Sequence, residues 1–322
     1  MKTVIGNRAS SILYNWLKIN NIKGNVLVPA NICESVPATY MKAGCKVIFC
    51  DIELNSLEIG YDQFQQVAQK YNINILHFNH TYGNCKRDYE IKLNKFRKLN
   101  SNLLIVEDCC LCTPDMKYSH LADIVIYSTG KTKYVNIGVG GFAHIKDKWK
   151  YNNIDLEYST DMEDMFESHV KECHLNTKKT NLDIFLSNWL NSQINYSVEE
   201  YFGLVNKQKI VVESHKKRIN EIYKDIPGSM PSNYNNWRYN ILVENQKECI
   251  DALFSSGLYC SSHYMSLGNG YFSDIITPNC NYLYTHVINL FNDFSYTEDQ
   301  ALRTMKILKK IARKASVTLW KQ

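Results

Sequence analysis

The sequence contains few of the residues that interrupt regular structure. Its 322 residues include only 14 glycines and 6 prolines, which argues against a collagen-like or linker-rich chain. No segment reaches the roughly 18 to 20 apolar residues that are needed to span a bilayer. The N-terminus also lacks an apolar core of signal-peptide length. We therefore expect neither membrane insertion nor export, and we expect the protein to be cytoplasmic.

The chain also lacks a strong excess of charge of either sign. Lys and Arg together number 37 and Asp and Glu 32, so the net charge is +5. This small surplus gives no reason to expect a nucleic-acid partner. Hydrophobic residues make up 45% of the chain, enough for a sizeable core, which excludes a disordered protein. At about 150 residues per domain, the length predicts two domains, or one large domain with a small appendage.

Eleven cysteines are present, but their spacing is not that of a metal site. Cys109, Cys110 and Cys112 form a cluster that lacks the repeated CxxC pairs of zinc sites. A chain without an export signal keeps its thiols reduced by default. We therefore predict no metal and no disulfide bonds, and we interpret these cysteines as small residues beside a strand end.

Short apolar runs alternate with helical patterns in the first 150 residues. The runs are rich in β-branched residues and apolar nearly throughout, as in strands covered on both faces; they lie at 26–29, 47–51, 73–78, 103–108, 123–128 and 140–145. Amphipathic stretches lie between several of them, at 8–20, 33–43, 61–71 and 89–99. This alternation predicts βαβ units and a mostly parallel sheet.

The second half of the chain predicts a smaller α/β unit. Residues 146–200 show no clear strand and include an apolar helical segment at 182–190. A long charged helix is expected from about 199 to 225, before a break at Pro227, Gly228 and Pro231. We then expect strands at 237–243, 258–261 and 286–291, a helix at 246–256, and a last helix that begins with a capping box of Thr297 and Gln300.

Polar side chains follow the predicted strands at their carboxyl ends, where ligands bind to a parallel sheet. Asp108 ends one strand, Ser128 ends the next, and Lys131 and Lys133 follow shortly after. A half-buried carboxylate needs a cationic partner, and lysine is the side chain that reacts with carbonyl compounds. Each feature alone is more typical of a cap, turn or polar loop. Their order and spacing together favour pyridoxal 5′-phosphate (PLP).

These segments resemble the motifs of the DegT/DnrJ/StrS-type aminotransferases, PLP enzymes of the aspartate aminotransferase fold (fold type I). The resemblance covers about residues 5–145 and resumes weakly over 200–312; it rests on VLVPANICESVPATYMKAGCKVIFCDIELNSLEI (26–59), FNHTYGN (78–84), IVEDCCLCTPD (105–115) and IVIYSTGKTKYVNIGVGGF (124–142). It implies a three-layer α/β fold with a mostly parallel central sheet. It also implies a large PLP-binding domain at 1–205 and a small C-terminal α/β domain at 206–322.

The resemblance assigns roles to individual residues. It makes Lys133 the catalytic lysine that bonds to the PLP aldehyde, with Lys131 the weaker candidate. The cofactor-binding residues that it implies are Asp108 at the ring nitrogen, Ser128, Arg8 and Ala9 at the phosphate, and Cys33, Leu111 and His80. Cys33 and Leu111 stand where the family usually has an aromatic and a hydrogen-bonding residue. The cysteines at 33, 109, 110 and 112 are then expected to line the PLP pocket.

Candidate substrate contacts are weaker. His263 and Tyr264 lie in the segment SSHYMSLGNG (261–270), which resembles the part of the family that approaches the active site. Arg218 and Arg238 could bind a carboxylate or phosphate, although surface ion pairs are the commoner role of arginine.

The resemblance implies an aminotransferase that moves an amino group from an amino-acid donor, with glutamate expected, to a keto-sugar. The sugar is expected to be nucleotide-linked, for surface polysaccharide or secondary metabolite biosynthesis. A homodimer with shared active sites is also implied. Three alternatives stay open: a sugar dehydratase, in which a His replaces the lysine; an aminotransferase for a small keto-phosphate; and a PLP-binding regulatory protein without turnover. A dehydrogenase is disfavoured because no GxGxxG follows the first strand.

Overall fold

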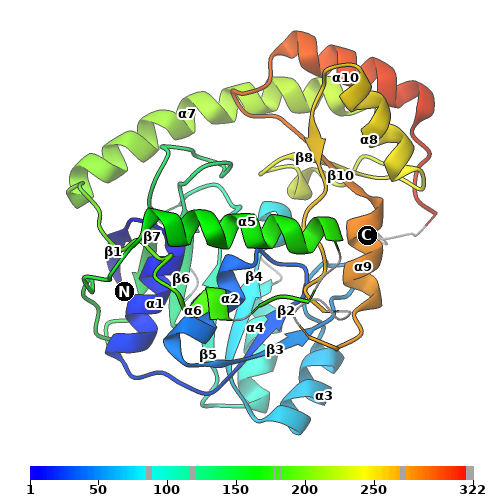
Figure 1. The fold of residues 1–322 in the computed structure, drawn as a ribbon. Coiled ribbons are helices and arrows are strands. Elements are labelled where there is room, and N and C mark those ends of the chain that lie inside the picture. The colour runs from blue at the N-terminus through cyan, green and yellow to red at the C-terminus, as the bar shows by residue number, and fades with distance from the viewer. Residues whose placement is uncertain (85–88, 116–119, 177–178, 182, 269–272, 317–322) are drawn as a thin grey trace.

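A computed structural model describes residues 1–84, 89–115, 120–176, 179–181, 183–268 and 273–316. Within these residues, seven strands form a large sheet in the order β1-β7-β6-β5-β4-β2-β3 (Figure 1). The strands are β1 (Lys2–Gly6), β2 (Asn25–Pro29), β3 (Lys46–Cys50), β4 (Ile73–Asn79), β5 (Leu104–Asp108), β6 (Ile124–Ser128) and β7 (Gly141–Ile145). Strands β2 to β6 are parallel, whereas β7 is antiparallel to both β6 and β1. The mostly parallel sheet is therefore confirmed.

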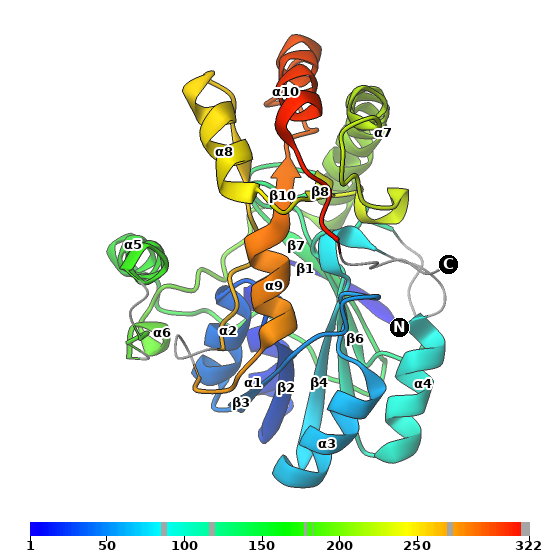
Figure 2. The same cartoon turned by 90° about the vertical axis from the view of Figure 1, so that its right-hand side faces the viewer.

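Helices cover both faces of this sheet. Successive strand residues point to opposite faces: in β6, Ile124 and Ile126 belong to one core and Val125 to the other. Helices α1 (Ala9–Ile19) and α2 (Ser35–Ala43) pack on the first face, and α3 (Tyr61–Tyr71), α4 (Tyr89–Leu99) and the first half of α7 (Val198–Tyr223) on the second (Figure 2). The structure thus has the predicted three layers.

A second, smaller sheet follows α7. It consists of β8 (Tyr239–Leu242), β10 (Val287–Leu290) and β9 (Cys260–Ser261), in that order and antiparallel. Helices α8 (Gln246–Ser255) and α10 (Glu298–Ile311) and the second half of α7 cover it with a core of their own. Residues from opposite ends of α7, such as Val205 and Tyr223, belong to different cores. One continuous helix therefore spans both parts of the chain.

The segment between the two sheets contains α5 (Thr160–Asn176) and α6 (Asp183–Leu186). Phe166 of α5 stacks on Trp189 with ring centroids 4.5 Å apart and meets Phe185 of α6 edge-on at 5.3 Å. These contacts attach α5 to the large domain, in front of the carboxyl ends of its strands (Figure 1). Two short 3₁₀ helices, η1 (Thr81–Gly83) and η2 (Ser232–Tyr234), complete the description with α9 (Pro278–His286).

Several element predictions are confirmed and some are corrected. The Thr297–Gln300 capping box opens α10 as predicted. The helix expected at 182–190 is a single turn, α6, and residue 182 lies outside the described residues. The sequence predicted neither β1 nor α9. The proposed domain boundary at 205/206 falls inside α7 and stays a prediction. Among the described helices, none is both long and apolar enough to cross a membrane.

Candidate active site

The carboxyl ends of the parallel strands surround a cavity of about 920 Å³. Ten of the residues that the sequence singled out line it: Arg8, Ala9, Cys33, His80, Asp108, Leu111, Ser128, Lys133, His263 and Tyr264. They come from the start of α1, the ends of four strands or the loops that follow them, and the small domain. The topology therefore brings together residues more than 250 positions apart.

Asp108 ends β5 and is held in its ionised form by its neighbours. Its Oδ2 accepts a hydrogen bond from His77 Nε2 over 3.1 Å, and its Oδ1 accepts one from the amide of Cys110 over 2.8 Å. Burial raises the pKa of the carboxyl, but the hydrogen bonds and charge of His77 and the contacts with Cys110 outweigh burial and lower the pKa to about 2. This carboxylate can therefore pair with a cationic nitrogen.

His77 is a site residue that sequence reasoning missed. A carboxylate only accepts hydrogen bonds, so His77 Nε2 must donate to Asp108, and its Nδ1 lies 3.0 Å from the hydroxyl of Tyr40. His77 and Tyr40 are both buried. The only available signal was a histidine in an otherwise apolar strand, since the pairing of β4 with β5 is invisible in the sequence.

His80, by contrast, lies at the cavity with its ring nitrogens engaged by the protein. Nδ1 donates to the carbonyl of Asn84, and Nε2 lies 2.9 Å from Glu107 Oε1. Cys109 adds a thiol, so three ligand-type atoms of His80, Glu107 and Cys109 lie within 4.8 Å of one another. We assign this buried cluster to the packing behind β5, because its hydrogen bonds run within the protein.

Ser128 and Lys133 belong to the end of β6 and the loop that follows it. Burial raises the pKa of both the Cys33 and the Cys110 thiol, and the charge of Lys133 offsets part of that rise. The lysine charge thus acts on two thiols that line the cavity. Lys131 also lines the cavity and is exposed, so the lining alone does not separate the two lysines.

The start of α1 lies against Gly140 and Gly141, at the beginning of β7. Gly140 has a φ of +94°, and its amide donates to the carbonyl of Asn7 over 2.7 Å. A Cβ on Gly141 would lie 2.7 Å from the amide nitrogen of Ala9, so only glycine permits this approach. The first amides of α1 have no intrahelical acceptor and, as at other helix N-termini, could bind an anion beside the Arg8 side chain, since Arg8, Ala9 and Ser10 line the cavity.

The cysteine prediction is correct only in part. Cys33 and Cys110 line the cavity, but Cys109 and Cys112 belong to the core on the opposite face of the sheet. Successive residues after a strand point to opposite sides, which separates Cys109 from Cys110. The ten cysteines among the described residues are not disulfide-bonded to one another.

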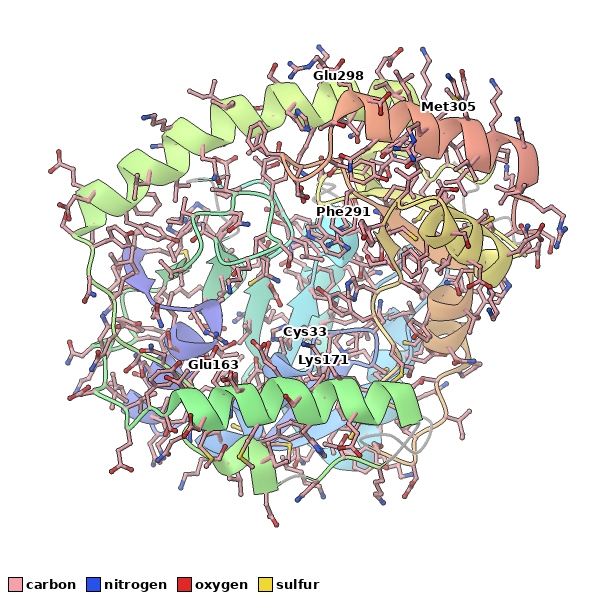
Figure 3. The ribbon with its side chains drawn as sticks, turned by 45° about the horizontal axis from the view of Figure 1, so that its top comes forward. Cys33, Glu163, Lys171, Phe291, Glu298 and Met305 are labelled. Atoms are coloured by element: carbon pink, nitrogen blue, oxygen red, sulfur yellow. The ribbon has the colours of Figure 1, made fainter. Side chains whose placement is uncertain are left out.

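Helix α5 closes one side of the cavity, which the sequence did not predict. Glu163, Phe166 and Lys171 line the cavity, and Glu163 forms an ion pair with Arg8. In Figure 3 the labelled Glu163 and Lys171 lie on α5, and Cys33 lies just behind the helix. The phosphate candidate Arg8 is therefore also a contact between α1 and α5.

The small domain contributes the remaining wall. Tyr264 lines the cavity, and its ring lies nearly parallel to Trp237 with centroids 6.4 Å apart. Burial raises the pKa of the Tyr264 phenol, and the nearby Cys33 and Asp108 raise it further. The hydroxyl therefore stays protonated. Residues 269–270 of the predicted substrate segment lie outside the described residues.

The two candidate arginines have different surroundings. Arg218 is exposed and pairs with Glu298 over 2.9 Å, as expected of a surface arginine. Arg238 is buried, so the expectation of a surface ion pair is wrong for this residue. Its guanidinium lies 4.5 Å from the Trp237 ring centroid and 4.0 Å from that of Phe291, which Figure 3 labels.

Taken together, the donor set fits PLP. It offers an ionised carboxylate for a ring nitrogen, a lysine amine for an aldehyde, and a serine hydroxyl, a guanidinium and helix amides for a phosphate. Because all of these groups line one cavity, no rearrangement of strands is needed to bring them together.

No protein-family model and no curated protein matches the sequence. Solved structures match it over most of their length. Spr1654 from Streptococcus pneumoniae, assigned as a sugar aminotransferase and solved in its PLP form, is 17% identical with a TM-score of 0.67, over 96% of this chain and 86% of that one. A DegT DnrJ EryC1 StrS aminotransferase from Brucella abortus is 15% identical with a TM-score of 0.65, over 96% and 86%. DesI, solved with its TDP-sugar product, is 14% identical with a TM-score of 0.67, over 96% and 80%. The chain therefore has the fold of these aminotransferases.

Proposed function

We propose that the protein is a PLP-dependent aminotransferase of the DegT/DnrJ/StrS type. The observation that carries this proposal is the meeting of Asp108, Ser128 and Lys133 around one cavity, in the chain order that the motifs require. The shared fold supports it, as does the PLP form of Spr1654.

In this proposal each residue has a defined task. Asp108, ionised at neutral pH, keeps a proton on the ring nitrogen of the cofactor. Ser128, Arg8 and the first amides of α1 hold its phosphate. Lys133 would hold the cofactor aldehyde and, as a free amine, would take a proton from the substrate Cα as a base and return a proton as an acid. PLP, when bound, supplies a sink for the negative charge that develops at Cα.

We infer that the donor is an amino acid, with glutamate expected, and that the acceptor is a nucleotide-linked keto-sugar. The TDP-sugar product in the DesI structure supports a sugar acceptor. Lys133 favours transamination over sugar dehydration, which uses a histidine at that position. We further propose a cytoplasmic homodimer with shared active sites and a role in surface polysaccharide or secondary metabolite biosynthesis.

A panel of acceptors tests this function. Purified protein is mixed with PLP, glutamate and either nucleotide-linked keto-sugars or small keto-phosphates, and 2-oxoglutarate formation is measured. We expect turnover with a keto-sugar and a change in visible absorbance when glutamate is added. Turnover with a keto-phosphate alone would support the small-acceptor alternative. A protein that binds PLP but turns over none of these would support a regulatory role.

Two lysine variants identify the catalytic group. Lys133→Ala should abolish both turnover and the visible absorbance of the bound cofactor, because the amine is lost. Lys131→Ala removes the neighbouring lysine and should retain the absorbance. If the first variant keeps both properties, or if the wild-type protein stays colourless with PLP, the proposed function is wrong.

A further inference from the structure

The loop that carries Lys133 is held from the small domain. Trp237 precedes β8, and its indole Nε1 donates a hydrogen bond to the carbonyl oxygen of Thr132 over 2.6 Å. Trp237 is only 3% exposed whereas Thr132 is exposed, so the donor side of this bond is shielded from competing water. Thr132 directly precedes Lys133, and a shift of its carbonyl would therefore shift the lysine.

Thr132 has a backbone conformation that needs external support. Its φ is 65°, in the left-handed region that β-branched residues rarely adopt. Within the loop, the amide of Lys133 bonds to the carbonyl of Gly130 over 3.3 Å, which is a long hydrogen bond. The shorter bond from Trp237 is thus the stronger restraint on this segment.

Trp237 is itself fixed on several sides. Its ring lies nearly parallel to those of Tyr82 and Tyr264, with interplanar angles of 13° and 10°. Lys216 Nζ donates to its carbonyl oxygen over 2.6 Å, and the Arg238 guanidinium packs on the ring. Because Tyr264 lines the cavity, Trp237 joins the small-domain wall of the site to the lysine loop.

We propose that Trp237 is a positioning residue for Lys133. Its N–H holds Thr132 in the left-handed conformation and so directs the lysine into the cavity from the small domain. What Lys133 does there rests on the proposed function, whereas the restraint by Trp237 does not.

Trp237→Phe tests the proposal, because phenylalanine keeps an aromatic ring between the two tyrosines and removes the N–H. Hydrogen exchange is measured on the protein without cofactor. We expect faster exchange in residues 131–134 and unchanged exchange in β7. The dissociation constant for PLP should rise about fivefold to tenfold, the effect of losing one buried hydrogen bond.

Trp149→Phe is the matched control, since that indole donates to Asp123 Oδ1 over 3.3 Å and does not line the cavity. It should leave exchange in residues 131–134 unchanged. If Trp237→Phe does not fold, benzothienylalanine at position 237 removes the N–H and preserves the ring shape. Unchanged exchange in residues 131–134, or an increase that extends through β7, would overturn the proposal. Failure of the wild-type protein to bind PLP would instead contradict the proposed function, and the exchange result would stand.

Discussion

At the scale of single residues, the charge of Asp108 depends on its neighbours and not on solvent. The carboxyl is largely buried, and burial alone would raise its pKa. His77 reverses this effect through a 3.1 Å hydrogen bond, and Tyr40 reaches the other ring nitrogen of the histidine over 3.0 Å. The charge at the base of the cavity is therefore a property of three residues on β5, β4 and α2.

His77→Leu should make cofactor binding depend on pH. With a pKa of about 2, Asp108 is ionised throughout the range from pH 5 to 8, so its own titration does not affect binding there. Removing His77 leaves burial to raise the pKa, and the carboxylate will gain a proton as the pH falls. We expect the ratio of the PLP dissociation constants at pH 5 and pH 8 to rise about tenfold relative to wild type.

His77→Gln provides the control, because its amide can still donate to Asp108. The ratio for this variant should lie between those of the leucine variant and the wild type. An unchanged ratio in His77→Leu would show that His77 does not set the charge of Asp108.

The sequence located Asp108 and Ser128 at the cavity, because each ends an apolar strand. The choice of Lys133 over Lys131 rests on the resemblance and stays a prediction. The sequence was not sufficient for His77 or Trp237. Their partners lie on other elements, and contacts between elements depend on sheet order and domain packing. That Cys109 and Cys110 point to opposite sides follows from their adjacency, but which of the two faces the cavity depends on where β5 ends.

At the scale of elements, α5 is attached to the core of the large sheet through one apolar side. Phe166 is its main apolar link, stacked on Trp189, and the Arg8–Glu163 ion pair ties its first turn to α1. The sequence indicated helices here but could not place them at the cavity, because tertiary packing decides which face an exposed helix presents. It missed β1 because KTVIG is too short for a clear alternation, and α9 because PNCNYLYTH has no amphipathic pattern.

Phe166→Ala should detach α5 without unfolding the sheet. Loss of a buried phenylalanine costs about 3–5 kcal/mol, and here the loss falls on the apolar side that attaches the helix. We expect faster hydrogen exchange and proteolysis within residues 160–176 and little change in β5 or β6. Met165→Ala, at a neighbouring position that is 51% exposed, should behave as wild type. Equal effects of the two substitutions would contradict this account of how α5 is held.

At the scale of the whole molecule, α7 connects the two cores, and Lys216 lies near their junction. Its ammonium group donates to the carbonyl of Trp237 and to Asn292 Oδ1, both over 2.6 Å. Burial lowers the pKa of the Lys216 ammonium group to about 7, and the charge of Asp293 offsets part of this effect. The general two-part architecture was predictable from the change of pattern after residue 146. The continuity of α7 through the expected boundary was not, because a helical pattern does not show which core each turn contacts.

Lys216→Met should change how stability varies with pH. Between pH 7 and about 10.5, the unfolded chain binds a proton at Lys216 that the folded protein does not, so the free energy of unfolding rises with pH. The slope is at most about 1.4 kcal/mol per pH unit. In urea unfolding at pH 7 to 10, we expect the wild type to gain stability relative to Lys216→Met. Lys217→Met, an exposed neighbour, should follow the wild type, and parallel curves for all three proteins would contradict the prediction.

The pairing of β1 with β7 has a consequence for the order of events during synthesis. Lys2 lies opposite Ile145, and the turn after β1 contacts Gly140. A ribosome adds roughly 5–20 residues per second, so the first strand waits on the order of ten seconds for its partner. During that time the turn at Arg8 and Ala9 lacks Gly140 and Gly141, against which it packs in the folded protein. The phosphate end of the site is therefore assembled late, although Arg8 and Ala9 are translated long before β7.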